Sequence, residues 1–379
     1  MHLEDHSMSK DENFWRIEEE YFSYDRKIAR KERKLASAKD RSKYKKSDQD
    51  QLKKRISSDD SNEYDHLQQG RVLAIQPEGI IVCSDQKNWI CSLKGSLKQD
   101  KNRIKNLVAV GDFVRFEETN SDQGCIVKVM QRHSILSRAD NLSRNKEQLI
   151  AVNIDQVLIT ASVAFPPLKP FLVDRYIIAA QKGNMEPIIL INKIDLLNSD
   201  SNEIEEERAL YNEFVKTYQD LDFKVIPISV ETGEGIAELK AAMYQKTSVF
   251  SGQSGVGKSS LINLVTGSSF ATGSVVQKTQ KGSHTTTTTH LVPLEDGGFC
   301  IDTPGIKSFG VWELKVDEIA SYFSEITSFS CHCKYPDCAH INEPQCAVKQ
   351  AVEENKISHL RFASYCALMA SVSEEHRQR

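Results

Sequence analysis

The sequence predicts a multidomain α/β protein, with a small N-terminal β-barrel, a central domain built on a parallel sheet, and a helical C-terminal domain that carries a cysteine cluster. Short β-rich runs fill the segment from Gly70 to about Arg138, and apolar strands alternate with helical stretches from about Gln148 onward. Four of the nine cysteines crowd into positions 331–346. The 379 residues exceed what one compact core holds, so we expect several domains.

The first 65 residues are rich in charge and poor in aliphatic residues in helical register. Fourteen lysines or arginines lie within residues 26–55, against four acidic residues. We expect residues 1–65 to be a flexible basic extension that can bind a polyanion. The alternative is a solvated charged tail without a partner.

Residues 66–137 are predicted to form a closed barrel. Gly, Asn and Asp turns separate the runs RVLAIQ, GIIVCS, WICSL, VGDFVRFEE and CIVKVMQ. Five short strands in this length fit an oligonucleotide-binding (OB) fold, although strand spacing alone also fits other small barrels.

The sequence also predicts the cellular compartment. No stretch approaches the roughly 20 apolar residues that cross a bilayer, and the N-terminus lacks the basic and then apolar run of a signal peptide. We therefore expect a cytoplasmic protein without membrane contact. An odd number of cysteines, with one tight cluster beside histidines, favours metal binding over a disulfide framework.

A phosphate-binding motif lies in the α/β domain, which we place at residues 138–310. The segment SVFSGQSGVGKSSLINLV reads as a strand, a loop and a helix with the pattern G-x-x-x-x-G-K-S. Backbone N–H groups of such a loop surround phosphate oxygens at a helix N-terminus. Lys258 is expected to reach the β and γ phosphates, and Ser259 to bind Mg²⁺. The predicted nucleotide contacts of the loop are Gly252, Gln253, Ser254, Gly255, Val256, Gly257, Lys258, Ser259 and Ser260.

A second motif selects the base. Asn192, Lys193 and Asp195 belong to an NKID tetrapeptide that follows the apolar strand IILI. The Asp195 carboxylate can accept hydrogen bonds from guanine N1–H and the 2-amino group, and adenine offers neither donor. Ser229, in the loop ISVETG after the strand VIPIS, is expected near the guanine O6. NKID alone is a common surface tetrapeptide, but beside a phosphate loop it predicts GTP as the nucleotide.

The remaining phosphate motif and the loop before it predict a switch. Asp302 and Gly305 belong to the DTPG motif. Asp302 is expected to hold the Mg²⁺ shell through water, and the Gly305 amide is expected to sense the γ phosphate. The hydroxyl-rich residues 282–290 suit a switch loop whose threonine completes the Mg²⁺ shell, and a solvated linker is the alternative. Ile306 stands where GTPases carry the glutamine that orients water, so we expect slow intrinsic hydrolysis with His284 as the assisting residue.

The order of these motifs is permuted, because the base-selecting loops precede the phosphate loop. The strands can keep their places in the same sheet while only their connections change. The DTPG motif then leads directly into the C-terminal domain, which we place at residues 311–379.

A metal-binding pattern lies in that domain. Cys333, Cys338, His340 and Cys346 form C-x4-C-x-H-x5-C. Three thiolates and one imidazole fill a tetrahedral Zn²⁺ shell and leave no open position, which predicts a structural zinc ion. Unliganded surface cysteines are the alternative.

The motifs GQSGVGKSSLIN, NKID, the histidine followed by threonines, DTPG with the segment 309–312, and CKYPDCAHINEPQCAV resemble those of the RsgA (YjeQ) family of circularly permuted GTPases. The resemblance covers roughly residues 70–370. It implies an OB-fold barrel, a permuted GTPase domain and a zinc domain in a monomer that binds the small ribosomal subunit and its ribosomal RNA. It implies hydrolysis of GTP to GDP during late subunit maturation, stimulated by the subunit, with His284 and Lys258 catalytic and Thr286 joining Ser259 on Mg²⁺.

Two other functions stay open at this point. One is a nucleic-acid-binding module whose nucleotide pocket is only structural. The other is an ATPase in a different process, which would require ATP to outcompete GTP despite Asp195.

Overall fold

The computed structural model describes residues 66–95, 107–139, 147–198, 202–267, 289–302 and 316–377, together with Tyr64, Leu97 and Leu314. The predicted basic extension lies outside the described residues, so its expected contact with a polyanion stays a prediction. Among the described helices, none combines the length and the apolar content that a bilayer crossing requires.

The N-terminal strands form the predicted five-stranded barrel. They are β1 (Gln68–Gln76), β2 (Gly79–Ser84), β3 (Lys87–Leu93), β4 (Phe113–Asn120) and β5 (Gln123–Val129). Neighbouring strands run in the order β1-β2-β3-β5-β4, and β1 pairs with β4 to close the ring. Alternate side chains such as Val72, Val82 and Phe116 fill the barrel core, which explains the two-residue period of the sequence.

The central domain is built on the predicted parallel sheet. Its strands are β8 (Gln156–Ser162), β9 (Glu186–Asn192), β10 (Lys224–Pro227), β11 (Thr247–Gly252), β12 (His290–Pro293) and β13 (Phe299–Asp302). They lie in the order β10-β9-β8-β11-β13-β12, and only β12 is antiparallel to its neighbour in this set. A hairpin of β6 (Ile135–Ala139) and β7 (Glu147–Val152), which the sequence did not predict, precedes the sheet.

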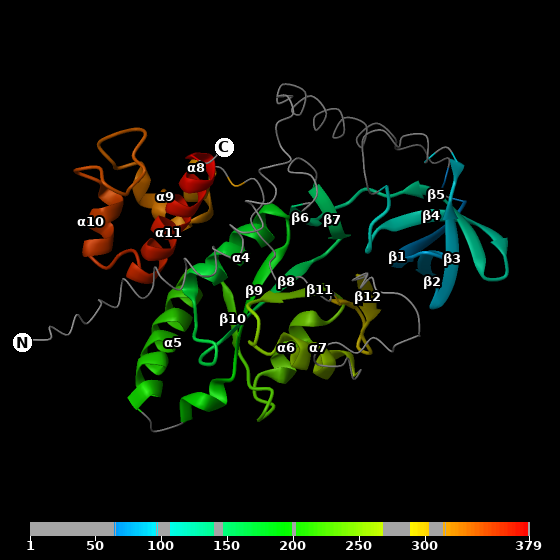
Figure 1. Cartoon of the computed structure of the whole chain (residues 1–379), viewed down its shortest axis with the longest axis horizontal. Coiled ribbons are helices and arrows are strands. Elements are labelled where there is room, and N and C mark those ends of the chain that lie inside the picture. The colour runs from blue at the N-terminus through cyan, green and yellow to red at the C-terminus, as the bar shows by residue number, and fades with distance from the viewer. Residues whose placement is uncertain are drawn as a thin grey trace, which may run out of the picture. The chain divides into compact units, whose positions relative to one another are not determined.

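Helices cover both faces of this sheet (Figure 1). They are α4 (Pro170–Lys182), α5 (Asn202–Asp220), α6 (Ile236–Met243) and α7 (Lys258–Thr266), with a short 3-10 turn, η4 (Ile194–Asn198), before α5. In β8, Val157 and Ile159 pack with α4 and α5, whereas Leu158 between them packs with α6 and α7. Because strands such as β8 are buried on both faces, their sequences are continuous apolar runs.

The C-terminal domain is helical, as the sequence predicts. Its elements are α8 (Val316–Ile319), η5 (Ala320–Tyr322), α9 (Ser324–Ser330), α10 (Ala347–Glu353) and α11 (His359–Arg377). Its core packs against Phe171 and Ile178 of α4, whose other side faces the sheet. Helix α4 is thus buried between the sheet and the C-terminal domain.

Candidate nucleotide-binding site and metal centre

The phosphate loop lies between β11 and α7, at the carboxyl end of the sheet. Gly252 and Gly257 have φ values of 138° and 96°. A Cβ on Gly252 would meet the Thr160 carbonyl oxygen at 2.0 Å, and one on Gly257 would meet the Asn192 side-chain nitrogen at 2.3 Å. These two positions therefore require glycine on both conformational and steric grounds. No side chain caps the start of α7, where the motif places the phosphates.

Lys258, the first residue of α7, folds back over this loop. Its Nζ donates to the carbonyl oxygens of Gly252 at 2.8 Å and Gln253 at 2.6 Å. Burial lowers the pKa of Lys258 to about 8. Among the described residues no carboxylate pairs with this ammonium, and anionic phosphates would supply a counter-charge.

Asn192 joins the base-selecting motif to the phosphate loop. Its buried side-chain amide donates to the Val256 carbonyl oxygen at 2.8 Å. Because Asn192 ends β9 and Val256 follows β11, this bond holds the two loops at a fixed separation.

Asp195 is held by the second predicted base loop. The hydroxyl of the fully buried Ser229 donates to Asp195 Oδ1 at 2.6 Å and accepts from the Thr232 amide at 3.1 Å. The bond fixes one carboxylate oxygen of the residue that is expected to read guanine. The structure therefore brings the two predicted base-selecting loops into direct contact.

The loop between β8 and α4 also borders the site, and the sequence analysis did not single it out. The Lys193 ammonium donates to the Phe165 carbonyl oxygen. Pro166 Cδ would lie 3.5 Å from a Cβ on Gly255. The stretch FPPLKP between a buried strand and a helix was the available signal, but prolines at such a junction are common in any α/β protein.

Only part of the predicted switch falls within the described residues. Asp302 ends β13, next to β11, and its backbone pairs with His290 of β12. Ser259 and Ser260 lie in the first turn of α7, and Ser254 and Gly255 are exposed in the phosphate loop. The hydroxyl of Ser259 and the end of β13 thus occupy the same end of the sheet, which suits an oxygen-bound Mg²⁺. His284, Thr286 and Gly305 lie outside the described residues.

The four predicted zinc ligands converge in the C-terminal domain. The ligand atoms of Cys333, Cys338, His340 and Cys346 all lie within 4.8 Å of one another. His340 Nδ1 is 3.5 Å from both Cys333 Sγ and Cys346 Sγ, and those two sulfurs are 3.8 Å apart. Tetrahedral zinc with bonds of about 2.3 Å to sulfur and 2.0 Å to nitrogen requires separations of about 3.5–3.8 Å. The residues therefore fit a zinc ion.

Hydrogen bonds outside the four-residue cluster also hold the loop that carries these ligands. The Glu343 carboxylate accepts from the amides of Ala339 at 3.0 Å and Ile341 at 2.9 Å, and the Tyr365 hydroxyl donates to the Ala339 carbonyl at 3.0 Å. Burial lowers the pKa of His340, which favours the neutral imidazole that metals bind. Cys331 and His332 contact each other at 3.2 Å and stay outside the four-residue cluster.

Fold and site together define a circularly permuted P-loop GTPase, because base-selecting strands β9 and β10 precede the phosphate-loop strand β11 in the chain. The chain is similar to a solved structure of YjeQ from Thermotoga maritima, with a TM-score of 0.64, 28% identity, and coverage of 80% of this chain and 98% of that one. It is equally similar to YloQ, described as a circularly permuted GTPase, with a TM-score of 0.64 and 26% identity over 83% of this chain and 98% of that one.

Sequence comparison gives the family. The RsgA GTPase family model matches residues 129–312. The Chlorobaculum parvum protein named small ribosomal subunit biogenesis GTPase RsgA is 40% identical over 72% of this chain and 88% of its own length. Its namesake from Actinobacillus succinogenes is 39% identical over 72% of this chain and 77% of its own. The chain belongs to the RsgA GTPase family, which confirms the predicted resemblance.

Proposed function

We propose that this protein hydrolyses GTP to GDP and phosphate during late maturation of the small ribosomal subunit, to which it binds. The observation that carries the proposal is the pair of bonds that links Ser229 to Asp195 and Asn192 to Val256. They hold the carboxylate that is expected to select guanine at a fixed position relative to the phosphate loop, as a site that binds one nucleotide requires. The relatives named for small-subunit biogenesis support the partner.

The proposed roles follow the motifs. The amides of the phosphate loop and Lys258 hold the phosphates, and Ser259, Thr286 and Asp302 hold Mg²⁺. When bound, Mg²⁺ neutralises charge that develops on the phosphate oxygens. The Gly305 amide contacts the γ phosphate, and His284 orients the attacking water. The backbone around Ser229 faces the guanine O6, and the stem of Lys193 covers the ring.

The outer domains are proposed to serve the partner. The barrel and the basic extension contact ribosomal RNA, and a zinc ion on Cys333, Cys338, His340 and Cys346 stabilises the C-terminal loop. The protein acts as a monomer in the cytoplasm.

GTP turnover by the full-length protein, with and without purified small subunits, tests the proposal. We expect slow turnover alone, faster turnover with subunits, and none in Lys258→Ala. The control is Lys240→Ala, which removes an exposed lysine on α6 and should keep wild-type turnover. A wild type that shows no turnover with or without subunits would favour the nucleic-acid-binding module. Tighter binding of ATP than GTP in direct competition would favour the ATPase.

A further inference from the structure

The barrel and the GTPase sheet are joined through one barrel strand. Strand β1 pairs with β2 and β4 inside the barrel, and it also pairs with β12 through Ala74 and His290. His290 in turn pairs with Asp302, the last residue of β13. A continuous row of backbone therefore runs from the barrel to the predicted Mg²⁺-binding aspartate.

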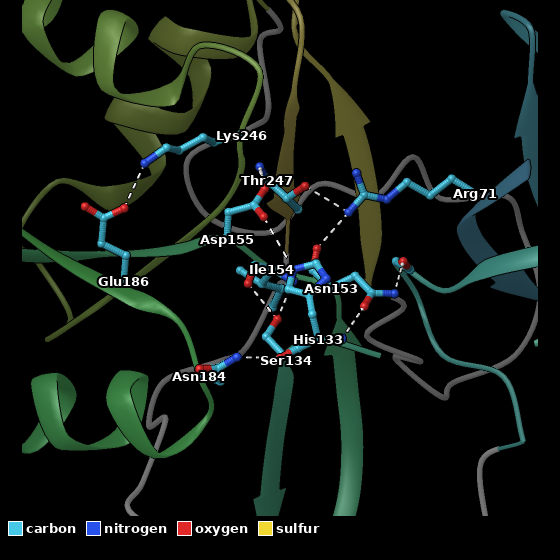
Figure 2. Close-up of polar contacts among 11 residues, drawn as sticks. Arg71, His133, Ser134, Asn153, Ile154, Asp155, Asn184, Glu186, Lys246 and Thr247 are labelled. Atoms are coloured by element: carbon cyan, nitrogen blue, oxygen red, sulfur yellow. Dashed lines mark hydrogen bonds and ion pairs between the residues drawn. The ribbon is translucent and has the colours of Figure 1, made fainter. Parts of the chain in front are cut away.

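Arg71 crosses the same junction three residues earlier in β1 (Figure 2). Its guanidinium donates to the Asn153 carbonyl oxygen and to Thr247 Oγ1, each at 2.8 Å. The group also lies between two rings, 4.9 Å from Phe113 of the barrel and 4.6 Å from Phe299 of β13. One side chain thus contacts the barrel and three segments of the GTPase domain.

The residues that Arg71 contacts lead to the nucleotide site. Thr247 begins β11, which ends at Gly252 of the phosphate loop, and Phe299 begins β13, which ends at Asp302. β11 and β13 therefore connect the contacts of Arg71 with the loops that are expected to hold the phosphates and Mg²⁺.

The junction is kept in register by a second layer of bonds around Asn153. Its side chain accepts from the His133 amide at 3.0 Å and donates to the Gly111 carbonyl at 3.0 Å. The neighbouring Asp155 accepts from the Thr247 amide at 2.6 Å (Figure 2). The carbonyl of Asn153 and the hydroxyl of Thr247 are therefore presented to Arg71 at fixed positions.

We propose that Arg71 is a positioning residue through which the barrel acts on the nucleotide site: when the barrel binds a polyanionic surface, Arg71 and β1 shift β11 and β13 into the geometry that hydrolyses GTP. The predicted surface is ribosomal RNA, so this inference rests on the proposed function. Because coupling between two sites is reciprocal, the state of the nucleotide must also alter the junction.

The first test compares turnover with and without small subunits for full-length variants. Arg71→Met keeps much of the apolar stem but cannot donate to Asn153 or Thr247. We expect the ratio of stimulated to basal turnover to fall about fivefold or more. Arg71→Lys should recover part of the ratio. The matched control is Lys240→Met, which removes an exposed cation on α6, outside the barrel, and it should keep the wild-type ratio.

Thr247→Val covers the case in which Arg71→Met does not fold. It removes the hydroxyl acceptor on the GTPase side and keeps the backbone bond to Asp155. It should lower the ratio as Arg71→Met does, and the double variant should lose little more. A wild-type ratio in Arg71→Met or in a folded Thr247→Val would overturn the inference.

A second test needs no ribosomal subunit. Amide exchange of residues 73–76 should differ between the GDP-bound and GTP-analogue-bound wild type, and Arg71→Met or Thr247→Val should abolish the difference. Equal exchange in the two wild-type complexes would overturn the inference even if subunits stimulate turnover. If amide exchange differs between the two complexes but subunits do not stimulate turnover, the coupling is supported and the proposed partner is wrong.

Discussion

Two arginines fasten the outer domains to the GTPase domain, and they do so with different chemistry. Arg361 of α11 pairs with Asp174 of α4 and donates from Nε to Glu325 Oε1 at 2.7 Å. Arg71 donates only to a carbonyl and a hydroxyl, and its Nε has no hydrogen-bond partner among the described residues. The joint to the C-terminal domain is therefore an ion pair, and the joint to the barrel is not.

The pKa values of the two guanidinium groups differ in the same way. Burial alone would lower the pKa of Arg361, but the carboxylates of Asp174 and Glu325 outweigh burial and raise that pKa. Burial lowers the pKa of Arg71 to about 10, and the attraction of Asp155 only partly opposes the shift. Opposite charges therefore hold the joint to the C-terminal domain, whereas two neutral acceptors and two aromatic rings hold the joint to the barrel.

The largest expected effect is at the joint between the GTPase domain and the C-terminal domain. Arg361→Met leaves the fully buried Asp174 without its counter-charge, and breaking such a pair costs about 3–5 kcal/mol. We expect a loss of this size in the free energy of unfolding, measured by urea denaturation of the full-length protein.

Its control removes both charges of that buried pair. Arg361→Met with Asp174→Leu leaves no unpaired charge at α4 and should recover part of the loss. A loss in Arg361→Met smaller than that in Arg71→Met would contradict the comparison between the joints.

A smaller effect is expected at the barrel joint. Arg71→Met strands two neutral acceptors, Asn153 O and Thr247 Oγ1, at about 1–3 kcal/mol in the free energy of unfolding. The same urea measurement checks it. Lys87→Met is the reference, since an exposed pair contributes about 0–1 kcal/mol. An Arg71→Met variant as stable as Lys87→Met would show that this joint contributes nothing to stability.

Neither joint could be predicted from the sequence, although the sites they serve could. The phosphate loop, NKID and the zinc cluster are short patterns in which every residue lies near its partners in the chain or at the end of a predictable strand. Arg361 and Asp174 are 187 residues apart, and each reads as an ordinary helix residue. The bond between Ser229 and Asp195 could be predicted only in part. The sequence placed both residues at strand ends, but it could not show that they meet.

The contact between the barrel and the GTPase sheet could not be predicted from the sequence either. Its five strands follow from local alternation, but the pairing of Ala74 with His290 joins segments whose sequences carry no mutual signal. The hairpin of β6 and β7 was missed for a related reason, since β6 alone reads as the end of the barrel.

Lys258 is a half-buried cation whose expected counter-charge is the phosphates of the nucleotide. Its neighbours at hydrogen-bond distance are two carbonyls, and burial lowers its pKa to about 8, so a growing fraction is neutral above pH 8. Bound phosphates favour the charged form and raise that pKa, so binding above pH 8 must take up a proton.

Affinity for GDP should be level below about pH 7.5 and then fall, at most about tenfold per pH unit. Equilibrium titrations between pH 7 and 9 measure this, with Lys258→Arg as the variant that stays charged and should show no such fall. A wild-type affinity that holds level to pH 9 would mean that the lysine is already fully charged in the empty site.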